Sequence, residues 1–113
     1  MPDLDGTPGA DKLYGVGGDD VLHGGDGDDL LDGGDGEDAA DYADAVSGVK
    51  VALGRVGSQD TGGGGLDTLY SIENLLGSAF ADELLGDGSA NKLFGGSGTD
   101  RLVGGGGNDE LDG

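Results

Sequence analysis

The sequence repeats itself every nine residues, and this period limits what the chain can fold into more than any other feature. Cutting residues 6–41 and residues 77–112 at every ninth position gives eight nonapeptides, and residues 62–70 form a ninth outside that frame. All of them fit the template G-G-x-G-x-D-x-L-x to varying degrees. Position six is Asp in all but one repeat, where it is Asn91, and position eight is Leu in all but one, where it is Ala40. Chance does not produce two columns this strict at one fixed spacing.

Each nonapeptide divides into a turn and a strand. Glycine at positions one, two and four permits positive φ and close approach of neighbouring backbones, so positions one to six predict a tight turn. Positions seven to nine alternate outward, inward and outward, as in a short β-strand. A turn and a strand reverse the chain by about half a revolution, so two repeats, or 18 residues, close one coil. The predicted fold is all-β: a parallel β-roll, or β-helix-like solenoid, whose stacked coils lie roughly 4.8 Å apart.

Stacking of the coils also decides where the side chains at positions eight and six lie. The inward leucines form a ladder between two parallel sheets: Leu13, Leu22, Leu31, Leu69, Leu84, Leu93, Leu102 and Leu111. The aspartates form columns, for example Asp20 over Asp38 and Asp82 over Asp100. Like charges this close repel each other by several kcal/mol at an effective dielectric constant of about 20. The fold therefore opposes itself unless a cation lies between the layers.

Oxygen atoms are the ligands that these turns offer to a cation. The chain has no Cys, and its single His, His23, falls at an outward position nine, where we expect a surface residue and not a ligand or catalyst. Carboxylates and backbone carbonyls in an irregular cage of six to eight positions suit Ca²⁺ better than Mg²⁺, which demands octahedral geometry. Zinc and copper favour nitrogen and sulfur ligands. The turns therefore predict calcium binding.

Composition alone would predict disorder. Of 113 residues, 29 are Gly, 24 are Asp or Glu and 5 are Lys or Arg, which gives a formal net charge of −19. High charge and few large apolar residues normally prevent a packed core. The charge is densest in residues 1–41, at −12, compared with −2 for residues 42–76 and −5 for residues 77–113. We expect the first block to bind cations most strongly and to be the more disordered when free.

Several other classes of protein are disfavoured by the sequence. Nucleic acid is not an expected partner, because phosphate binding needs positive charge. No apolar run approaches the 18 residues of a membrane span, and without Cys there is no disulfide. There is no GxxxxGK[ST] phosphate loop, and a spacing of nine is not that of an EF-hand. The serines lack a base-and-orienter set, and no cleft is implied that would raise the pKa of an acid, so we expect no enzymatic activity.

The repeats resemble the calcium-binding nonapeptides of the RTX (repeat-in-toxin) family, whose unit is G-G-x-G-x-D-x-U-x. The resemblance covers about four fifths of the chain. It implies a right-handed parallel β-roll with Ca²⁺ held between successive turns on both edges. It also implies type I export, with the chain unfolded in the low-calcium cytoplasm and folded outside, and hence a secreted, extracellular location.

The resemblance also assigns ligands, position by position. The position-six ligands are Asp11, Asp20, Asp29, Asp38, Asp67, Asp82, Asn91, Asp100 and Asp109, of which Asn91 is a neutral ligand at best. Backbone carbonyls of the glycine turns complete each site, at Gly15, Gly17, Gly24, Gly33, Gly95 and Gly104. We expect several calcium ions, at least four, to bind to this ligand set.

Four substitutions depart from the glycine pattern. Phe80 and Ser89 replace the fourth glycine of their repeats, so we expect these two turns to be distorted and their sites weak or empty. Thr7 and Val16 replace the second glycine, which is a milder departure.

An insertion separates the two repeat blocks. Apolar residues alternate over residues 49–53, which predicts one β-strand, and the glycine-rich stretch after it predicts a flexible connection. Residues 71–76 start the second stack, with Glu73 in the position-six slot as a candidate extra ligand. We expect the insertion to cover the side or the joint of the roll. The predicted organisation is a single β-roll domain, residues 1–113, made of a first repeat block (6–41), the insertion (42–61) and a second repeat block (62–112).

The function that these features predict is a non-enzymatic calcium-binding module that folds when Ca²⁺ binds between stacked turns, in a secreted protein. Two alternatives stay open: a C-terminal export and folding module of a secreted enzyme, and a surface-layer or adhesive structural protein. An apolar stripe at position nine would serve a neighbouring domain or self-association, although ordinary surface exposure explains it equally well. The stripe consists of Tyr14, Tyr70, Leu85, Phe94 and Val103.

Overall fold

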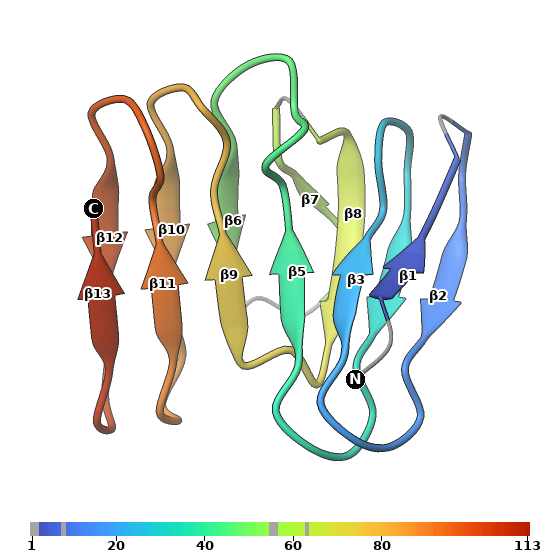
Figure 1. Ribbon diagram of the computed structural model, residues 1–113, viewed down its shortest axis with the longest axis horizontal. Coiled ribbons are helices and arrows are strands. Elements are labelled where there is room, and N and C mark those ends of the chain that lie inside the picture. Colours follow the sequence, from blue (N-terminus) through green and yellow to red (C-terminus); the bar gives the residue numbers. More distant parts are fainter. Residues whose placement is uncertain (1–2, 8, 55–56, 63) are drawn as a thin grey trace.

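The computed structural model describes residues 3–7, 9–54, 57–62 and 64–113, and every regular element in these ranges is a β-strand (Figure 1). The strands are β1 (Asp3–Asp5), β2 (Lys12–Tyr14), β3 (Val21–His23), β4 (Leu30–Asp32), β5 (Ala39–Asp41), β6 (Lys50–Ala52), β7 (Gln59–Asp60), β8 (Leu66–Tyr70), β9 (Asn74–Leu76), β10 (Glu83–Leu85), β11 (Lys92–Phe94), β12 (Arg101–Val103) and β13 (Glu110–Asp112). No helix in the described ranges could cross a membrane.

The strands make the two faces of a flattened coil. One face is a six-stranded parallel sheet in the order β1-β3-β5-β9-β11-β13, seen at the front of Figure 1. The opposite face consists of two sheets, β2-β4-β8-β7 and β12-β10-β6. The all-β parallel roll predicted from the repeats is confirmed. Its two stacks are joined on the first face, where β5 pairs with β9, and remain separate sheets on the second.

Strands within a repeat block pair with the strand two repeats away. Leu13 on β2 lies opposite Leu31 on β4, and Leu84 on β10 lies opposite Leu102 on β12, each an offset of 18 residues. Because side chains alternate along a strand, this register places the position-eight side chains over one another, with Ala40 in place of a leucine opposite Leu22. The predicted coil of two nonapeptides is therefore the repeating unit of the fold.

The core is a single ladder of inward side chains. Leu22, Leu31, Leu84 and Leu93 are buried, with at most 1% of their surface exposed. Full burial of one such side chain stabilises the fold by about 1.5–3 kcal/mol. The ladder loses cover towards its end, since Leu111 on β13 is 47% exposed. A core only one side chain wide leaves much of the stability to the turns.

The insertion builds the joint between the two sheets of the second face. β6 pairs with β10 and β8 pairs with β4, although β6 precedes β8 in the chain. Between them β7 pairs antiparallel with β8, and Val49 forms an antiparallel bridge with Gly62. The side chain of Gln59 accepts a hydrogen bond from the N–H of Ala52 at 2.8 Å and donates one to its carbonyl at 2.9 Å. A short antiparallel segment thus fills the place where two parallel sheets meet.

Candidate metal centre

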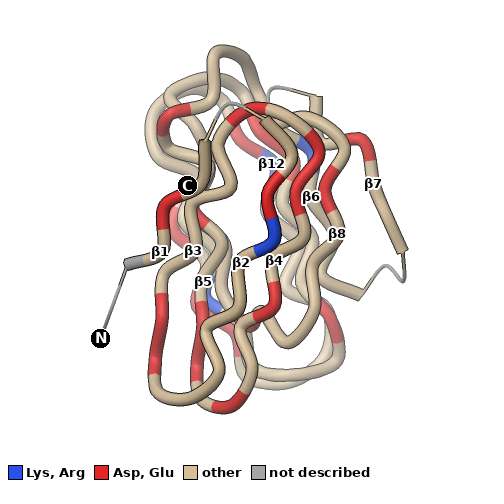
Figure 2. Tube along the Cα trace, turned by 90° about the vertical axis from the view of Figure 1, so that its right-hand side faces the viewer, with Lys and Arg blue, Asp and Glu red and all other residues tan. Residues whose placement is uncertain are grey.

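The turns of the roll lie along two edges. The turns that lead out of the six-stranded sheet form the first edge, and those that lead into it form the second edge. Nonapeptide turns of the first edge are 6–11, 24–29, 77–82 and 95–100, and those of the second are 15–20, 33–38, 86–91 and 104–109. Figure 2 shows Asp and Glu on both edges and few Lys or Arg near them. Negative charge is therefore concentrated where the chain turns.

Along each edge the position-six residues form the predicted columns and are linked by hydrogen bonds. The backbone N–H of Asp20 donates to Oδ1 of Asp38 at 2.8 Å. The same bond joins Asp11 to Asp29 at 3.0 Å, Asp29 to Asp67 at 2.9 Å, Asp82 to Asp100 at 2.9 Å and Asn91 to Asp109 at 2.8 Å. In each acceptor carboxylate this hydrogen bond thus occupies Oδ1, and the second oxygen, Oδ2, takes no part in it.

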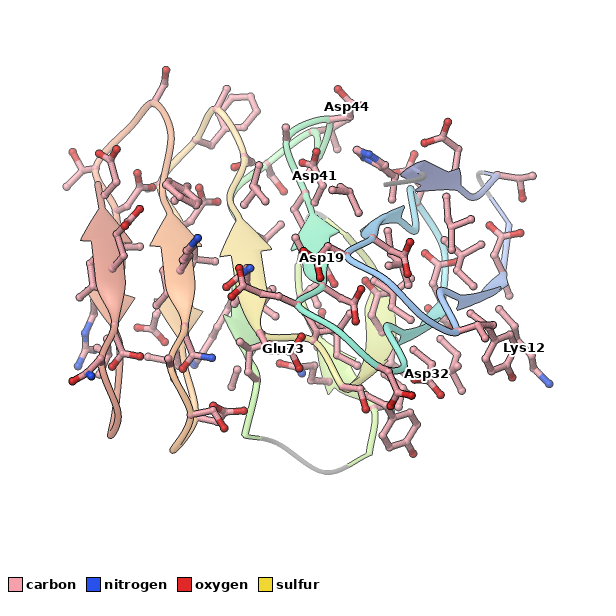
Figure 3. All side chains as sticks on the ribbon, turned by 60° about the horizontal axis from the view of Figure 1, so that its bottom comes forward. Lys12, Asp19, Asp32, Asp41, Asp44 and Glu73 are labelled. Carbon is pink, nitrogen blue, oxygen red and sulfur yellow. The ribbon has the colours of Figure 1, made fainter. Side chains whose placement is uncertain are left out.

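Two residues outside the nonapeptides also occupy slots in the columns. Glu73, at the turn into β9 in Figure 3, accepts a hydrogen bond from the N–H of Asp38 at 2.7 Å, as a position-six Asp would. Its backbone carbonyl accepts from Nδ2 of Asn91 at 2.7 Å. Val49 donates its N–H to Oδ1 of Asp82 at 2.8 Å but brings no carboxylate. The second column therefore has a carboxylate at the joint, that of Glu73, whereas the first column has none at Val49.

Several of these carboxylates are buried without a complete set of partners. Asp20, Asp29 and Asp38 each expose 3% or less of their surface. Both carboxylate oxygens of Asp20, and Oδ2 of Asp29, Asp38 and Asp100, have no hydrogen-bond partner among the described residues. A buried charge without a partner destabilises a fold by several kcal/mol. A cation at these oxygens would remove that cost.

Burial and crowding also raise the pKa of carboxylates in the columns. Desolvation, with the negative charges of Asp67 and Asp11 adding to it, raises the pKa of Asp29 to about 7. Desolvation likewise raises the pKa of Asp67 to about 6. The pKa values of Asp38 and Glu73 are raised too, mainly by desolvation. Without a cation, these groups hold protons more tightly than free carboxylates do.

Glycine at position one brings backbone carbonyls next to the carboxylates. A Cβ atom placed on Gly15 would lie 2.5 Å from Oδ2 of Asp20 and 2.6 Å from the carbonyl oxygen of Gly33 in the next coil. A Cβ on Gly104 would lie 2.5 Å from Oδ2 of Asp109. The space beside the glycine is thus lined by oxygens, which any side chain would displace. Hard oxygen donors from side chain and backbone together suit Ca²⁺.

The predicted glycine ligands differ in whether they lie beside a position-six side chain. Gly15, Gly24, Gly33, Gly95 and Gly104 each lie against the position-six side chain of their own turn. Gly17, at position three, has nothing within 4 Å of the place where a Cβ would lie. In the described part of the chain, no three acidic or histidine side chains cluster closely enough to hold a metal by themselves. Any ion must therefore also use backbone carbonyls.

Some of the position-six groups have protein donors that sequence reasoning did not identify. Oγ of Ser78 donates to Oδ1 of Asp82 at 2.6 Å, and the hydroxyl of Tyr42 donates to Oδ2 of Asp67 at 3.0 Å. The signal for the first contact is a hydroxyl residue at position two, four residues before the Asp. Tyr42 lies in the insertion, where no period relates it to Asp67.

His23 lies away from both columns, as its outward position predicts. Its Nδ1 is 3.3 Å from Oδ2 of Asp41, and its Nε2 is 4.0 Å from Oδ1 of Asp5. Asp5 lies opposite His23 in register, and Asp41 is the last residue of β5, which pairs with β3. The contact belongs to the surface of the sheet and not to the turns.

The stacked turns, with their carboxylates and carbonyls, define a class of protein: a β-roll whose turns can hold calcium. The family model of the RTX calcium-binding nonapeptide repeat matches the chain in four copies, over residues 5–39 and 74–113. These residues make up more than half of the sequence, and the chain belongs to this family. No curated protein matches it. RTX repeats bind calcium, are generally non-catalytic structural modules, and are typically found in secreted proteins.

Proposed function

We propose that this chain is a calcium-dependent folding module, which stays unfolded at low calcium and closes into its β-roll when Ca²⁺ fills the turns. The observation that supports this is the set of buried carboxylate oxygens without partners, at Asp20, Asp29, Asp38 and Asp100. An ion that binds the folded chain and hardly binds the free one stabilises folding by about 2.7 kcal/mol at a hundredfold excess over its Kd. Four such ions would add roughly 11 kcal/mol, which matches the whole stability of a small domain.

The ligand set that we propose combines position-six carboxylates with position-one carbonyls. The carboxylates are those of Asp20, Asp29, Asp38, Asp100 and Asp109, and the carbonyls are those of Gly15, Gly24, Gly33, Gly95 and Gly104. Turns 15–20 and 33–38 have the strongest support, because they are neighbours on one edge and both carry a buried carboxylate oxygen without a partner. Five turns of this kind would accommodate the four or more ions expected.

Circular dichroism and ion counting test this function together. We expect the β-sheet signal to be lost in chelator, to return with Ca²⁺ and not with Mg²⁺, and equilibrium dialysis to find several bound calcium ions. Asp38→Asn should lower the ion count by one, whereas Asp35→Asn, which removes the same charge from an exposed position of the same turn, should leave it unchanged. A chain that is equally folded in chelator would overturn the proposal, and an equal response to Mg²⁺ would overturn its calcium selectivity.

We further propose that the module acts in a secreted protein and folds after export. The family is typical of secreted proteins, and extracellular calcium modules have Kd values on the order of 10⁻⁴–10⁻³ M. Such weak sites stay empty in a low-calcium cytoplasm and fill outside the cell. A calcium titration measures this directly: a Kd on the order of 10⁻⁹–10⁻⁸ M, as in cytosolic calcium buffers, would contradict it.

A further inference from the structure

In the eight nonapeptide turns whose position-two residue the structure describes, that residue takes one of two conformations. In five turns this residue has positive φ: Val16 (75°), Gly25 (78°), Gly34 (75°), Gly96 (77°) and Gly105 (80°). In the other three it does not, and the residues there are Thr7, Ser78 and Asp87. We name the first group, turns 15–20, 24–29, 33–38, 95–100 and 104–109, open turns. We name the second group, turns 6–11, 77–82 and 86–91, capped turns.

In each capped turn the position-two N–H donates to the position-six side chain of the same turn. Ser78 donates from its N–H to Oδ2 of Asp82 at 2.9 Å and from its hydroxyl to Oδ1 at 2.6 Å. The corresponding N–H bonds run from Thr7 to Oδ2 of Asp11 at 2.6 Å and from Asp87 to Oδ1 of Asn91 at 3.0 Å. The position-six group is thus held from within its own turn.

The unpartnered oxygens are confined to the open turns. Asp20, Asp29, Asp38 and Asp100, the residues with a buried oxygen that lacks a donor, all lie in open turns. Val16 indicates that backbone conformation decides this and not glycine itself, because its φ is positive and Oδ2 of Asp20 in its turn is without a partner. A positive φ at position two therefore goes with a carboxylate oxygen that lacks a hydrogen-bond donor in four of the five open turns.

Acidic charge in the turns of the first block agrees with this division. Capped turn 6–11 contains one acidic residue, whereas open turns 15–20, 24–29 and 33–38 contain two, three and three. In the second block each open turn contains one acidic residue, as each capped turn does. The extra negative charge of the first block thus lies in open turns, where a cation would offset its repulsion.

We propose that the residue at position two determines whether a turn takes calcium: open turns bind an ion, and capped turns replace it with the N–H of that residue, joined in turns 6–11 and 77–82 by its hydroxyl. This rests on the proposed calcium function. In a capped turn an ion would have to displace the hydrogen bonds of the position-two residue and turn a residue with a side chain to positive φ, which L-residues disfavour. Glycine at position two carries no such penalty.

Asp67 belongs with the capped groups, although its donor comes from the insertion. Its Oδ1 accepts from the N–H of Asp29 at 2.9 Å, and its Oδ2 accepts from the hydroxyl of Tyr42 at 3.0 Å. Asp67 and Tyr42 are both buried. With both oxygens occupied, Asp67 holds the joint of the roll together without an ion.

The decisive experiment opens a capped turn. Ser78→Gly combined with Phe80→Gly gives turn 77–82 the sequence of an open turn, and we expect equilibrium dialysis to find one more calcium ion per chain than in the wild type. Ser97→Gly, at position three of an open turn, is the matched control and should leave the ion count unchanged.

Removing a carboxylate provides a second test that does not depend on the double variant folding. Asp82→Asn should leave the calcium count unchanged, whereas Asp100→Asn in the neighbouring open turn of the same column should lower it by one. An unchanged count in a folded Ser78→Gly, Phe80→Gly variant, or the loss of one ion in Asp82→Asn, would overturn the inference. A wild type that binds no calcium would instead overturn the proposed function.

Discussion

Val16 is a β-branched residue in the left-handed region of the backbone, with φ of 75°. An L-residue with a side chain is disfavoured there by about 1–2 kcal/mol. Its side chain is 75% exposed, so little packing offsets this strain. The open-turn conformation is imposed on Val16 by its neighbours in the stack and not by its own preference.

Val16→Gly should therefore stabilise the calcium-bound protein by about 0.5–1 kcal/mol, because relief of strain exceeds the greater flexibility of Gly in the unfolded chain. Urea denaturation in saturating Ca²⁺ measures the change. Val46→Gly is the control, since Val46 is equally exposed at 75% and its φ is not positive, so that change should not stabilise. A lower free energy of unfolding in Val16→Gly would contradict the expectation.

Much of the candidate site could be predicted at this scale, because the period alone fixes which residues stack. Asp20 over Asp38 follows from two repeats per coil. The capping of Asp82 could not be predicted, since it depends on whether Ser78 takes a negative φ and turns its N–H towards the carboxylate. Sequence identifies the residue type, but the hydrogen bond decides whether the carboxylate is satisfied.

Among the elements, the turn into β9 differs from the repeat because it is shorter than a nonapeptide turn. Only residues 71–73 connect β8 to β9, where a nonapeptide turn has six residues. Glu73 still reaches the N–H of Asp38 with a side chain one methylene longer than that of Asp. Ile72 is buried against the core, which anchors the short turn.

The placement of Glu73 was predictable from the spacing to Asp82, whereas the antiparallel β7 was not, because residues 54–62 have no alternation of apolar residues.

The joint contains a buried tyrosine–carboxylate pair whose removal should be costly. Tyr42→Phe leaves Oδ2 of Asp67 buried without a donor, which should lower the free energy of unfolding by about 1–3 kcal/mol. Because the pair is independent of calcium in our proposal, the loss should be similar at saturating calcium and at a lower concentration that still folds the wild type. Urea denaturation at two calcium concentrations measures it, with Tyr70→Phe, 46% exposed, as the control. An effect confined to one calcium concentration would contradict a calcium-independent joint.

For the whole molecule, the raised carboxylate pKa values link stability to pH. Asp29 has a pKa of about 7 and Asp67 of about 6 in the folded chain, against 3.8 in the unfolded one. The folded state therefore binds more protons, so this contribution to stability is full below about pH 4 and is lost as the pH rises to about 7. Repulsion among the other acidic groups changes in the same direction.

We expect the metal-free chain, unfolded in chelator at neutral pH, to regain more β-sheet signal at pH 5 than at pH 8, measured by circular dichroism. In saturating Ca²⁺ the protein should instead be more stable at pH 8 than at pH 5, because calcium binds deprotonated carboxylates. A metal-free β-sheet signal that rises with pH would contradict the assigned pKa directions.

The order of strands on the second face binds the two halves of the molecule to each other. A cut between β6 and β7 would leave β6 on one fragment and its partner β10 on the other, and β4 apart from its partner β8 in the same way. We expect the two fragments to remain together in calcium and to elute as one species in size-exclusion chromatography. Separate elution under these conditions would show that the exchanged strands do not hold the halves together.

This exchange of strands also limits how the molecule can assemble when its chain emerges residue by residue, amino end first. After β6 has emerged, the edge of β4 is still open, and the strand that belongs there, β8, has yet to appear. β6 in turn must wait for β10, some 30 residues later, before it has a parallel neighbour. The roll therefore cannot wind up coil after coil from one terminus: its middle has to be left unfinished and closed afterwards.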